Sequence, residues 1–260
     1  MNKLTTLVLA LASGLALPSL AFSATVGTDN ASASAYDSGW VDGTDGSITG
    51  PGAYGMWFLN PDTSDITHET ASVSSLSSNA PLLDTNGVSF RMAGTNGAEA
   101  TAFRFIDPGG LSAGQSFSID IAVNFRNGYK GIDLRGTSEE TIFNFNVGDD
   151  DYVVNSAATG NGSIGNTYSD DTLFHIVFTQ DSASGGTWSI TRSGGVDDYA
   201  SGTYDGVARS IKLYVGSTAG TDADALFFNN LSTIPEPGQM AVLFGVVAYG
   251  LVALRRRKKA

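Results

Sequence analysis

Residues 116–125 read Ser-Phe-Ser-Ile-Asp-Ile-Ala-Val-Asn-Phe, and this stretch decides the fold class. Apolar side chains occupy every second position from Phe117 to Phe125, and mostly small or polar side chains fall between them. Successive side chains of a strand point to opposite faces, so this period of two predicts a half-buried β-strand. The dipeptide Asn127-Gly128, which favours tight hairpin turns, follows at once.

Similar short alternations lie on both sides of this strand, among them Phe103 and Phe105 on either side of Arg104. Segments predicted as strands are 53–59, 88–92, 103–105, 129–134, 143–147, 174–178, 188–190, 211–215 and 226–231. We expect residues 25–38 to be a loose lead-in and residues 60–80 to be a loop with at most a short strand. No stretch between residues 25 and 233 sustains a helical period, which indicates an all-β sandwich or barrel.

The order of these strands resembles the concanavalin A-like, laminin-G-like jelly roll. The resemblance depends on residues 114–120, on the hairpin within 173–192 and on residues 225–231. It implies one antiparallel jelly-roll β-sandwich over residues 24–232. It also makes carbohydrate binding the natural functional expectation, although a fold by itself does not imply a ligand.

The front of the chain has the organisation of an export signal. Met1-Asn2-Lys3 is a short positive start, an apolar run extends from Leu4 to Leu20, and small residues follow. These features predict a secretory signal peptide over residues 1–23, which is cleaved off and is not part of the folded domain. The chain contains no cysteine, so an exported domain would depend on core burial, on a metal or on both, and not on disulfides.

The end of the chain has three parts in order. Pro235, Glu236 and Pro237 come first, and an uncharged apolar run follows from Met240 to Leu254. A basic stretch then completes the tail: Arg255, Arg256, Arg257, Lys258 and Lys259. The run is shorter than the ~20 residues that span a bilayer, but local thinning can close the gap. It predicts a single transmembrane helix with the basic tail on the cytoplasmic side.

This tripartite segment, residues 233–260, resembles PEP-CTERM sorting signals. The resemblance implies recognition by a membrane-embedded exosortase, cleavage near Pro235-Glu236-Pro237, and release or transfer to the cell surface or the exopolysaccharide matrix of a Gram-negative-type bacterium. The other partners it implies are the export translocon and signal peptidase, with the inner membrane as a temporary location. An ordinary C-terminal anchor is the alternative interpretation.

The charge of the exported part narrows the choice of partner. The chain has 14 Lys and Arg residues against 26 Asp and Glu residues. Removing Lys3, the five tail cations and Glu236 leaves 8 against 25, a net charge of −17. Such an acidic surface disfavours nucleic acid and anionic lipid as partners.

Few residues offer catalytic chemistry. The Glu-x-Asp-x-Glu strand typical of hydrolytic jelly rolls is absent, and Glu139 and Glu140 are adjacent, which suits a solvated turn. His68 and His175 are the only histidines, and no Gly-x-Ser-x-Gly elbow accompanies them. We expect His175 to be a structural residue on a strand face, and His68 to lie in a polar loop without a partner. The sequence therefore predicts a protein that is not an enzyme.

Two kinds of binding site are candidates. Asp149, Asp151, Asp170 and Asp171 lie near turns and could supply oxygen ligands to a structural calcium ion, although solvated loop tips are the favoured interpretation and no cofactor is expected. Aromatic residues could stack against sugars. Trp57, Tyr129 and Tyr152 are the candidate glycan contacts, whereas Trp188 is expected in the core.

These observations predict an exported, non-enzymatic surface or matrix protein with a structural or adhesive role. A lectin-like carbohydrate-binding module is the alternative, and a glycan-active enzyme is a third. An exposed aromatic groove would favour glycan binding, two facing carboxylates would favour the enzyme, and a flat polar face would favour the structural role.

Overall fold

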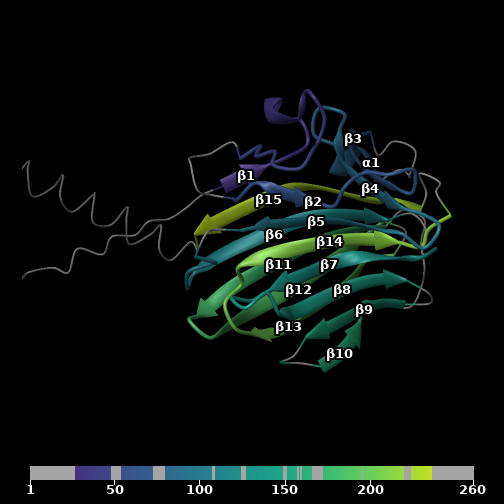
Figure 1. The fold of residues 1–260 in the computed structure, drawn as a ribbon. Coiled ribbons are helices and arrows are strands. Elements are labelled where there is room, and N and C mark those ends of the chain that lie inside the picture. The colour runs from purple at the N-terminus through teal and green to yellow at the C-terminus, as the bar shows by residue number, and fades with distance from the viewer. Residues whose placement is uncertain are drawn as a thin grey trace, which may run out of the picture.

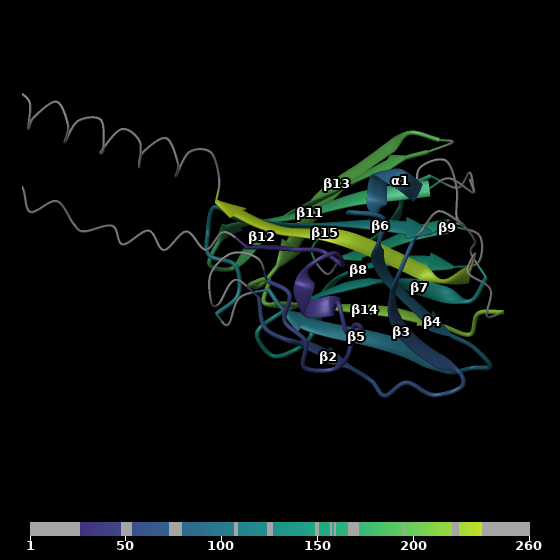
Figure 2. The same ribbon diagram turned by 90° about the horizontal axis from the view of Figure 1, so that it is seen from above.

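The strands form two sheets packed face to face (Figures 1 and 2). The computed structural model describes residues 27–47, 54–72, 80–106, 109–123, 127–148, 151–156, 158, 160–165, 172–194, 196–219 and 224–235. All pairings between the named strands are antiparallel. The predicted all-β sandwich is therefore confirmed.

We name the first layer sheet A. Its strands, in spatial order, are β13 (Asp198–Asp205), β12 (Gly185–Ser193), β11 (Thr172–Ser182), β6 (Gln115–Val123), β15 (Leu226–Pro235), β4 (Ser89–Gly94) and β3 (Ile66–Ala71). The short strand β1 (Gly27–Asp29) pairs with the end of β15. Two short helical turns belong to neighbouring loops, η1 (Ser34–Tyr36) and α1 (Ala80–Leu83).

Sheet B is the second layer. Its strands, in spatial order, are β10 (Gly160–Ser163), β9 (Asp151–Ser156), β8 (Thr141–Gly148), β7 (Tyr129–Arg135), β14 (Ser210–Gly216), β5 (Glu99–Phe105) and β2 (Trp57–Leu59). The chain crosses between the layers repeatedly, for example from β5 to β6 and from β6 to β7.

The core lies between the sheets, where the alternating apolar residues meet. Phe117, Ile119 and Ile121 of β6 are fully buried, as their period of two predicts. Across the gap, Phe143 of β8 lies 5.0 Å from Phe178 of β11, measured between ring centroids. Burial of each such side chain stabilises the fold by about 1.5–3 kcal/mol.

In strand β5 the apolar side chains face outward and the charged side chain between them is buried, which is the opposite of the usual pattern. Phe103 and Phe105 point outward and pack on each other at 5.0 Å between ring centroids, whereas Arg104 between them is fully buried. The guanidinium lies 4.8 Å from the ring centroid of Tyr54 and 4.8 Å from that of Trp57. A buried arginine needs such partners, because desolvation of an unpaired charge is costly.

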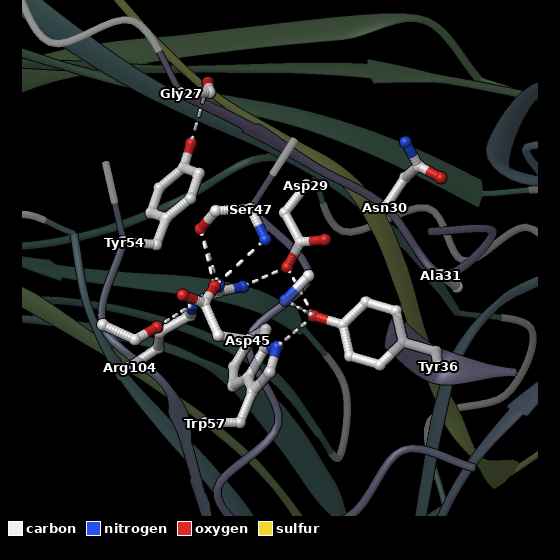
Figure 3. Close-up of polar contacts among 12 residues, drawn as sticks. Gly27, Asp29, Asn30, Ala31, Tyr36, Asp45, Ser47, Tyr54, Trp57 and Arg104 are labelled. Atoms are coloured by element: carbon white, nitrogen blue, oxygen red, sulfur yellow. Dashed lines mark hydrogen bonds and ion pairs between the residues drawn. The ribbon is translucent and has the colours of Figure 1, made fainter. Parts of the chain in front are cut away.

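Figure 3 shows how Arg104 ties the start of the domain to the sandwich. Its Nη1 donates to Asp29 of β1, which is also fully buried, and its Nη2 donates to Asp45 at 2.8 Å. Tyr36 of η1 donates its hydroxyl to Asp29 at 2.6 Å and accepts from the Trp57 indole at 3.0 Å. The expectation of a loose lead-in is therefore wrong for residues 27–38, because a buried ion pair holds this part of the segment.

Several strands lack a readable apolar alternation, and the sequence prediction missed them. They are β1, β9, β10 and β13, whereas β3 is the one short strand that was allowed for within residues 60–80. The last strand was predicted to end at Leu231, but β15 continues to Pro235, which pairs with Gln115 of β6. Because β1 pairs with β15 between Leu231 and Thr233, the first and last described strands lie side by side (Figure 1).

Candidate functional site

The outer face of sheet A presents rows of hydroxyl groups. In β12 the even-numbered residues from Gly186 to Arg192 are buried, so the odd-numbered ones face outward. The antiparallel register places these next to the outward residues of β11 and β13, pairing Thr187 with Thr179 and Thr203. The outer face is therefore rich in Ser and Thr because the apolar residues of the same strands fill the core.

A groove of about 430 Å³ lies on this face, across β11, β12 and β13. Five Ser and Thr residues line it: Thr179, Thr187, Ser189, Ser201 and Thr203. Val177 and Tyr199 add apolar surface, and the lining includes no carboxylate, ammonium or guanidinium group. The groove therefore offers hydrogen bonds and apolar contact without charge, which is what a ligand rich in hydroxyl groups requires.

Tyr199 is the exposed aromatic residue of the groove. It stands on β13, the edge strand of sheet A, and 61% of the residue is accessible to solvent. Its neighbours on the outer face are small or polar, so its ring forms an open platform beside the hydroxyl groups. An aromatic ring presents both an apolar face and a polar tip, which suits recognition of a wet, amphipathic ligand.

Gly202 of β13 allows Trp188 to pack beneath the groove. A Cβ atom on Gly202 would lie 2.8 Å from Cζ2 of the Trp188 indole, which is too close. Trp188 is buried and lies 5.1 Å from Phe143 between ring centroids, so its predicted place in the core is confirmed. The floor of the groove is consequently supported by core packing.

His175 and Asp120 lie on the same outer face, in the cross-strand row that ends at Tyr199. The His175 Nδ1 is 2.6 Å from Oδ1 of Asp120, and the Asn230 amide donates to Oδ2 of Asp120 at 2.9 Å. The hydrogen bond to the Asp120 carboxylate raises the pKa of His175, against the opposing effect of burial. The prediction of a structural histidine on a strand face agrees with this hydrogen-bonded position.

Two of the three candidate glycan contacts are wrong. Trp57 is completely buried under Arg104, and Tyr152 is buried against Phe174, 4.9 Å away between ring centroids. Both residues face the core because their strand positions, and not their proximity to turns, decide their direction. Tyr129 is partly exposed, but it stands on sheet B and leans across Gly216, so it is remote from the groove.

The second histidine is also placed differently from the prediction. His68 lies on strand β3 and is buried, not in a polar loop. Its Nδ1 is 2.6 Å from Asp62, and its Nε2 is 3.1 Å from the carbonyl oxygen of Thr101. His68 therefore joins β3 to β5 as a structural residue with two partners. Glu139 and Glu140 do lie in a turn between β7 and β8, as predicted.

The remaining predicted sites fall mainly outside the described residues. Among the candidate calcium ligands, Asp149, Asp170 and Asp171 lie outside them, and Asp151 begins β9. No group of three or more metal-ligating side chains occurs among the residues that the structure describes. Of the predicted sorting segment, residues 233–235 are described as the end of β15; Glu236, Pro237, the apolar run and the basic stretch lie outside the described residues. Within the described part of the chain, no helix has the length and apolar character to cross a bilayer.

Comparison with known proteins gives structural likeness and no family. No family model matches the chain, and no curated protein does. Among solved structures, a sialidase aligns at 10% identity and a TM-score of 0.45, over 70% of this chain and 17% of its own. A galectin from Caenorhabditis elegans aligns at 16% identity and a TM-score of 0.32, over 48% of this chain and 84% of its own.

The receptor-binding domain of botulinum neurotoxin type G gives a third alignment. It has 10% identity and a TM-score of 0.38, over 70% of this chain and 43% of its own. The chain thus corresponds to less than half of the sialidase and neurotoxin chains. The assignment of a sandwich depends on the two sheets themselves, and the ligand has to be inferred from the groove.

Proposed function

We propose that the chain is an exported, non-enzymatic surface or matrix protein whose sandwich binds carbohydrate in the groove on sheet A. The observation that supports this is the combination of the five groove hydroxyl groups with the exposed ring of Tyr199. The hydroxyl groups can donate to and accept from sugar hydroxyls, and the tyrosine ring can stack against the apolar face of a sugar. A purely structural role would not require a groove with an open aromatic platform.

The test is a glycan array probed with the full-length protein in detergent, followed by titration of the best ligand. Tyr199→Ala should weaken binding about tenfold, because it removes the stacking surface. Phe58→Ala is the matched control, since Phe58 is also exposed, at 44%, but stands on sheet B. Failure to bind any glycan, or an equal loss in both variants, would refute the groove as a carbohydrate site.

The export route is the second part of the proposal. The apolar run and the basic tail follow Pro235-Glu236-Pro237 in the order of a sorting signal, and this order supports processing by an exosortase. Because β15 includes Pro235, cleavage after this residue would leave the last strand complete. Mass spectrometry of the protein on cell-surface material tests the route. A mature C-terminus near Pro237 is expected, and a surface-exposed protein that still ends at Ala260 would refute it.

A further inference from the structure

Four side chains from separate elements form one hydrogen-bonded chain on the outer face of sheet A. The Thr85 hydroxyl donates to Oδ1 of Asn230 at 2.9 Å, and the Asn230 amide donates to Oδ2 of Asp120 at 2.9 Å. Oδ1 of Asp120 then accepts from Nδ1 of His175 at 2.6 Å. Because the side-chain oxygen of Asn230 and both carboxylate oxygens of Asp120 are engaged, these hydrogen bonds fix the orientation of the His175 ring.

The backbone is strained at Asn230, one of the four hydrogen-bonded residues. Asn230 has a φ of 56°, in the left-handed region that residues with a side chain seldom adopt. It lies in a bulge of β15, where the register with β6 shifts between Asn229 and Ser232. Bulges re-aim side chains, and local strain is concentrated at functional sites. Here Asn229 is buried beneath the loop that follows α1, where its amide donates to the carbonyl oxygens of Leu83 and Val88, and the Asn230 amide reaches Asp120.

The Nε2 edge of His175 is the part of these four residues that can reach a ligand. Its side chain is 51% exposed, whereas that of Asp120 is 18% exposed, and its Nδ1 is engaged by the carboxylate. When the ring is neutral with its proton on Nδ1, Nε2 accepts a hydrogen bond; when it is protonated, Nε2 donates one and carries positive charge. The cluster therefore presents a positioned group whose character depends on pH.

The register connects this group to the groove. Asp120, His175, Thr191 and Tyr199 are successive cross-strand partners, so they form one row over four strands. His175 also precedes Val177 of the groove by two residues on the same face. At a strand spacing of about 4.8 Å, the backbones of His175 and Tyr199 lie roughly 10 Å apart. A ligand stacked on Tyr199 can therefore extend along the row to His175.

We propose that His175, oriented by Asp120 and Asn230, forms a subsite that extends the groove and binds the carboxylate of an acidic sugar. This inference rests on the proposed glycan-binding function and narrows it to a class of ligand. The carboxylate would accept a hydrogen bond from protonated Nε2, the only basic group that the row supplies. Thr191 from β12 and Asn230 from β15 are uncharged, so among the described residues of the neighbouring strands Asp120 is the charged side chain that faces the ring.

The position of the two charges favours this arrangement. Asp120 is held on the Nδ1 side of the ring, whereas a ligand approaches the Nε2 side, so the imidazolium separates the two carboxylates. In a domain of strongly negative net charge, an acidic sugar is repelled until this ring is protonated. Acidic oligosaccharides are therefore expected to bind better at pH 5.5 than at pH 8.5, and neutral ones equally well at both.

The first experiment uses the two histidines of the chain as separate NMR probes. The full-length protein with labelled histidine is titrated with acid and base, alone, with glucuronate and with glucose. Glucuronate should raise the pKa of His175 by about 0.3 units or more, because it stabilises the imidazolium, and glucose should not. The ring signals of His68, which is buried on sheet A away from the row, should not move when glucuronate is added, and they serve as the internal reference.

The second experiment measures affinities for paired acidic and neutral oligosaccharides across this pH range. The acid-to-alkaline affinity ratio should be about fivefold for the acidic ligand and should fall to one in His175→Gln. Asn230→Ala, which loosens a positioning residue, should reduce the ratio without abolishing binding of the neutral ligand. Phe58→Ala is the control, since Phe58 is exposed but stands on sheet B, outside the groove and the row, and it should leave the ratio unchanged.

The outcomes separate the two levels of the proposal. Binding of neutral glycans in the groove, with no response of His175 to glucuronate and no effect of pH, would overturn the acidic subsite alone. Absence of all glycan binding would overturn the carbohydrate function. A response of His175 to glucuronate together with a pH-dependent affinity that His175→Gln removes would establish the subsite.

Discussion

The ion pair between Arg104 and Asp29 gives the sharpest test of how the sandwich retains its N-terminal segment. Both residues are fully buried. Replacement of Arg104 by Met keeps most of the side-chain volume but removes the charge. It also removes the hydrogen bonds to the Gly55 carbonyl oxygen at 2.7 Å and to Asp45 at 2.8 Å. Asp29 is then left as a buried carboxylate whose cation is gone.

The expected loss follows from these contacts. Removing one partner of a buried ion pair costs about 3–5 kcal/mol, because the remaining charge is uncompensated. The stranded Gly55 carbonyl adds a further cost of about 1–3 kcal/mol. We therefore expect Arg104→Met to lower the free energy of unfolding by about 5 kcal/mol, a large part of the about 5–15 kcal/mol typical of a domain. The N-terminal segment should undock first, since β1 and η1 depend on this pair.

Denaturation in urea at pH 7, followed by tryptophan fluorescence, measures this loss. Lys212→Met is the control, because Lys212 pairs with Glu99 at 3.1 Å where both side chains are about a third exposed, and it should cost less than about 1 kcal/mol. Asp29→Asn combined with Arg104→Met should cost clearly less than the sum of the single variants. Strict additivity, or equal losses for Arg104→Met and Lys212→Met, would refute the reasoning.

Three further predictions follow from other parts of the structure. Burial lowers the pKa of Lys130 to about 8, so its folded form releases a proton before its unfolded form does, and stability should increase with pH between about 8 and 10.5. The free energy of unfolding of the native protein, minus that of Lys130→Met, should thus rise by about 2 kcal/mol between pH 7 and pH 10 when both are measured by urea denaturation. If this difference does not change with pH, the charged amine of Lys130 is not buried. Gly202→Ala should lower the free energy of unfolding by about 1–3 kcal/mol through its clash with Trp188, whereas Gly162→Ala, with open space around its Cβ position, should have little effect in the same assay. If the acidic loops are solvated and bind no calcium, the melting curve should be the same with and without a chelator; a lower melting temperature with chelator, together with calcium in elemental analysis, would show the opposite.

The sequence predicted the class of fold correctly because strand alternation is a local property. The apolar side chains of β6 recur at every second position, and burying them needs only a partner sheet, whichever strands supply it. The same argument failed for β5, where Phe103 and Phe105 face outward. The burial of Arg104 depends on Asp29, Asp45, Tyr54 and Trp57, which come from distant parts of the chain, so no local pattern could reveal it.

The candidate site was beyond the reach of the sequence for a similar reason. Tyr199 stands in β13, whose inward positions include Ala200 and Gly202, so the strand shows no apolar alternation and was not predicted. Proximity to a turn suggested Tyr129 and Tyr152, but only the pairing of strands decides which aromatic ring faces solvent beside a groove. Likewise, the row from Asp120 to Tyr199 exists because four strands are adjacent and in register.

The sequence by itself therefore determined the all-β class, the acidic and cysteine-free character of the chain, and the export and sorting expectations at its two ends. These properties depend on composition and on local order along the chain. The tertiary structure alone decided which face of each strand is buried, how Arg104 holds the N-terminal segment, and where hydroxyl groups, Tyr199 and His175 converge. Those features depend on register and on sheet order, which are set by contacts between residues far apart in sequence.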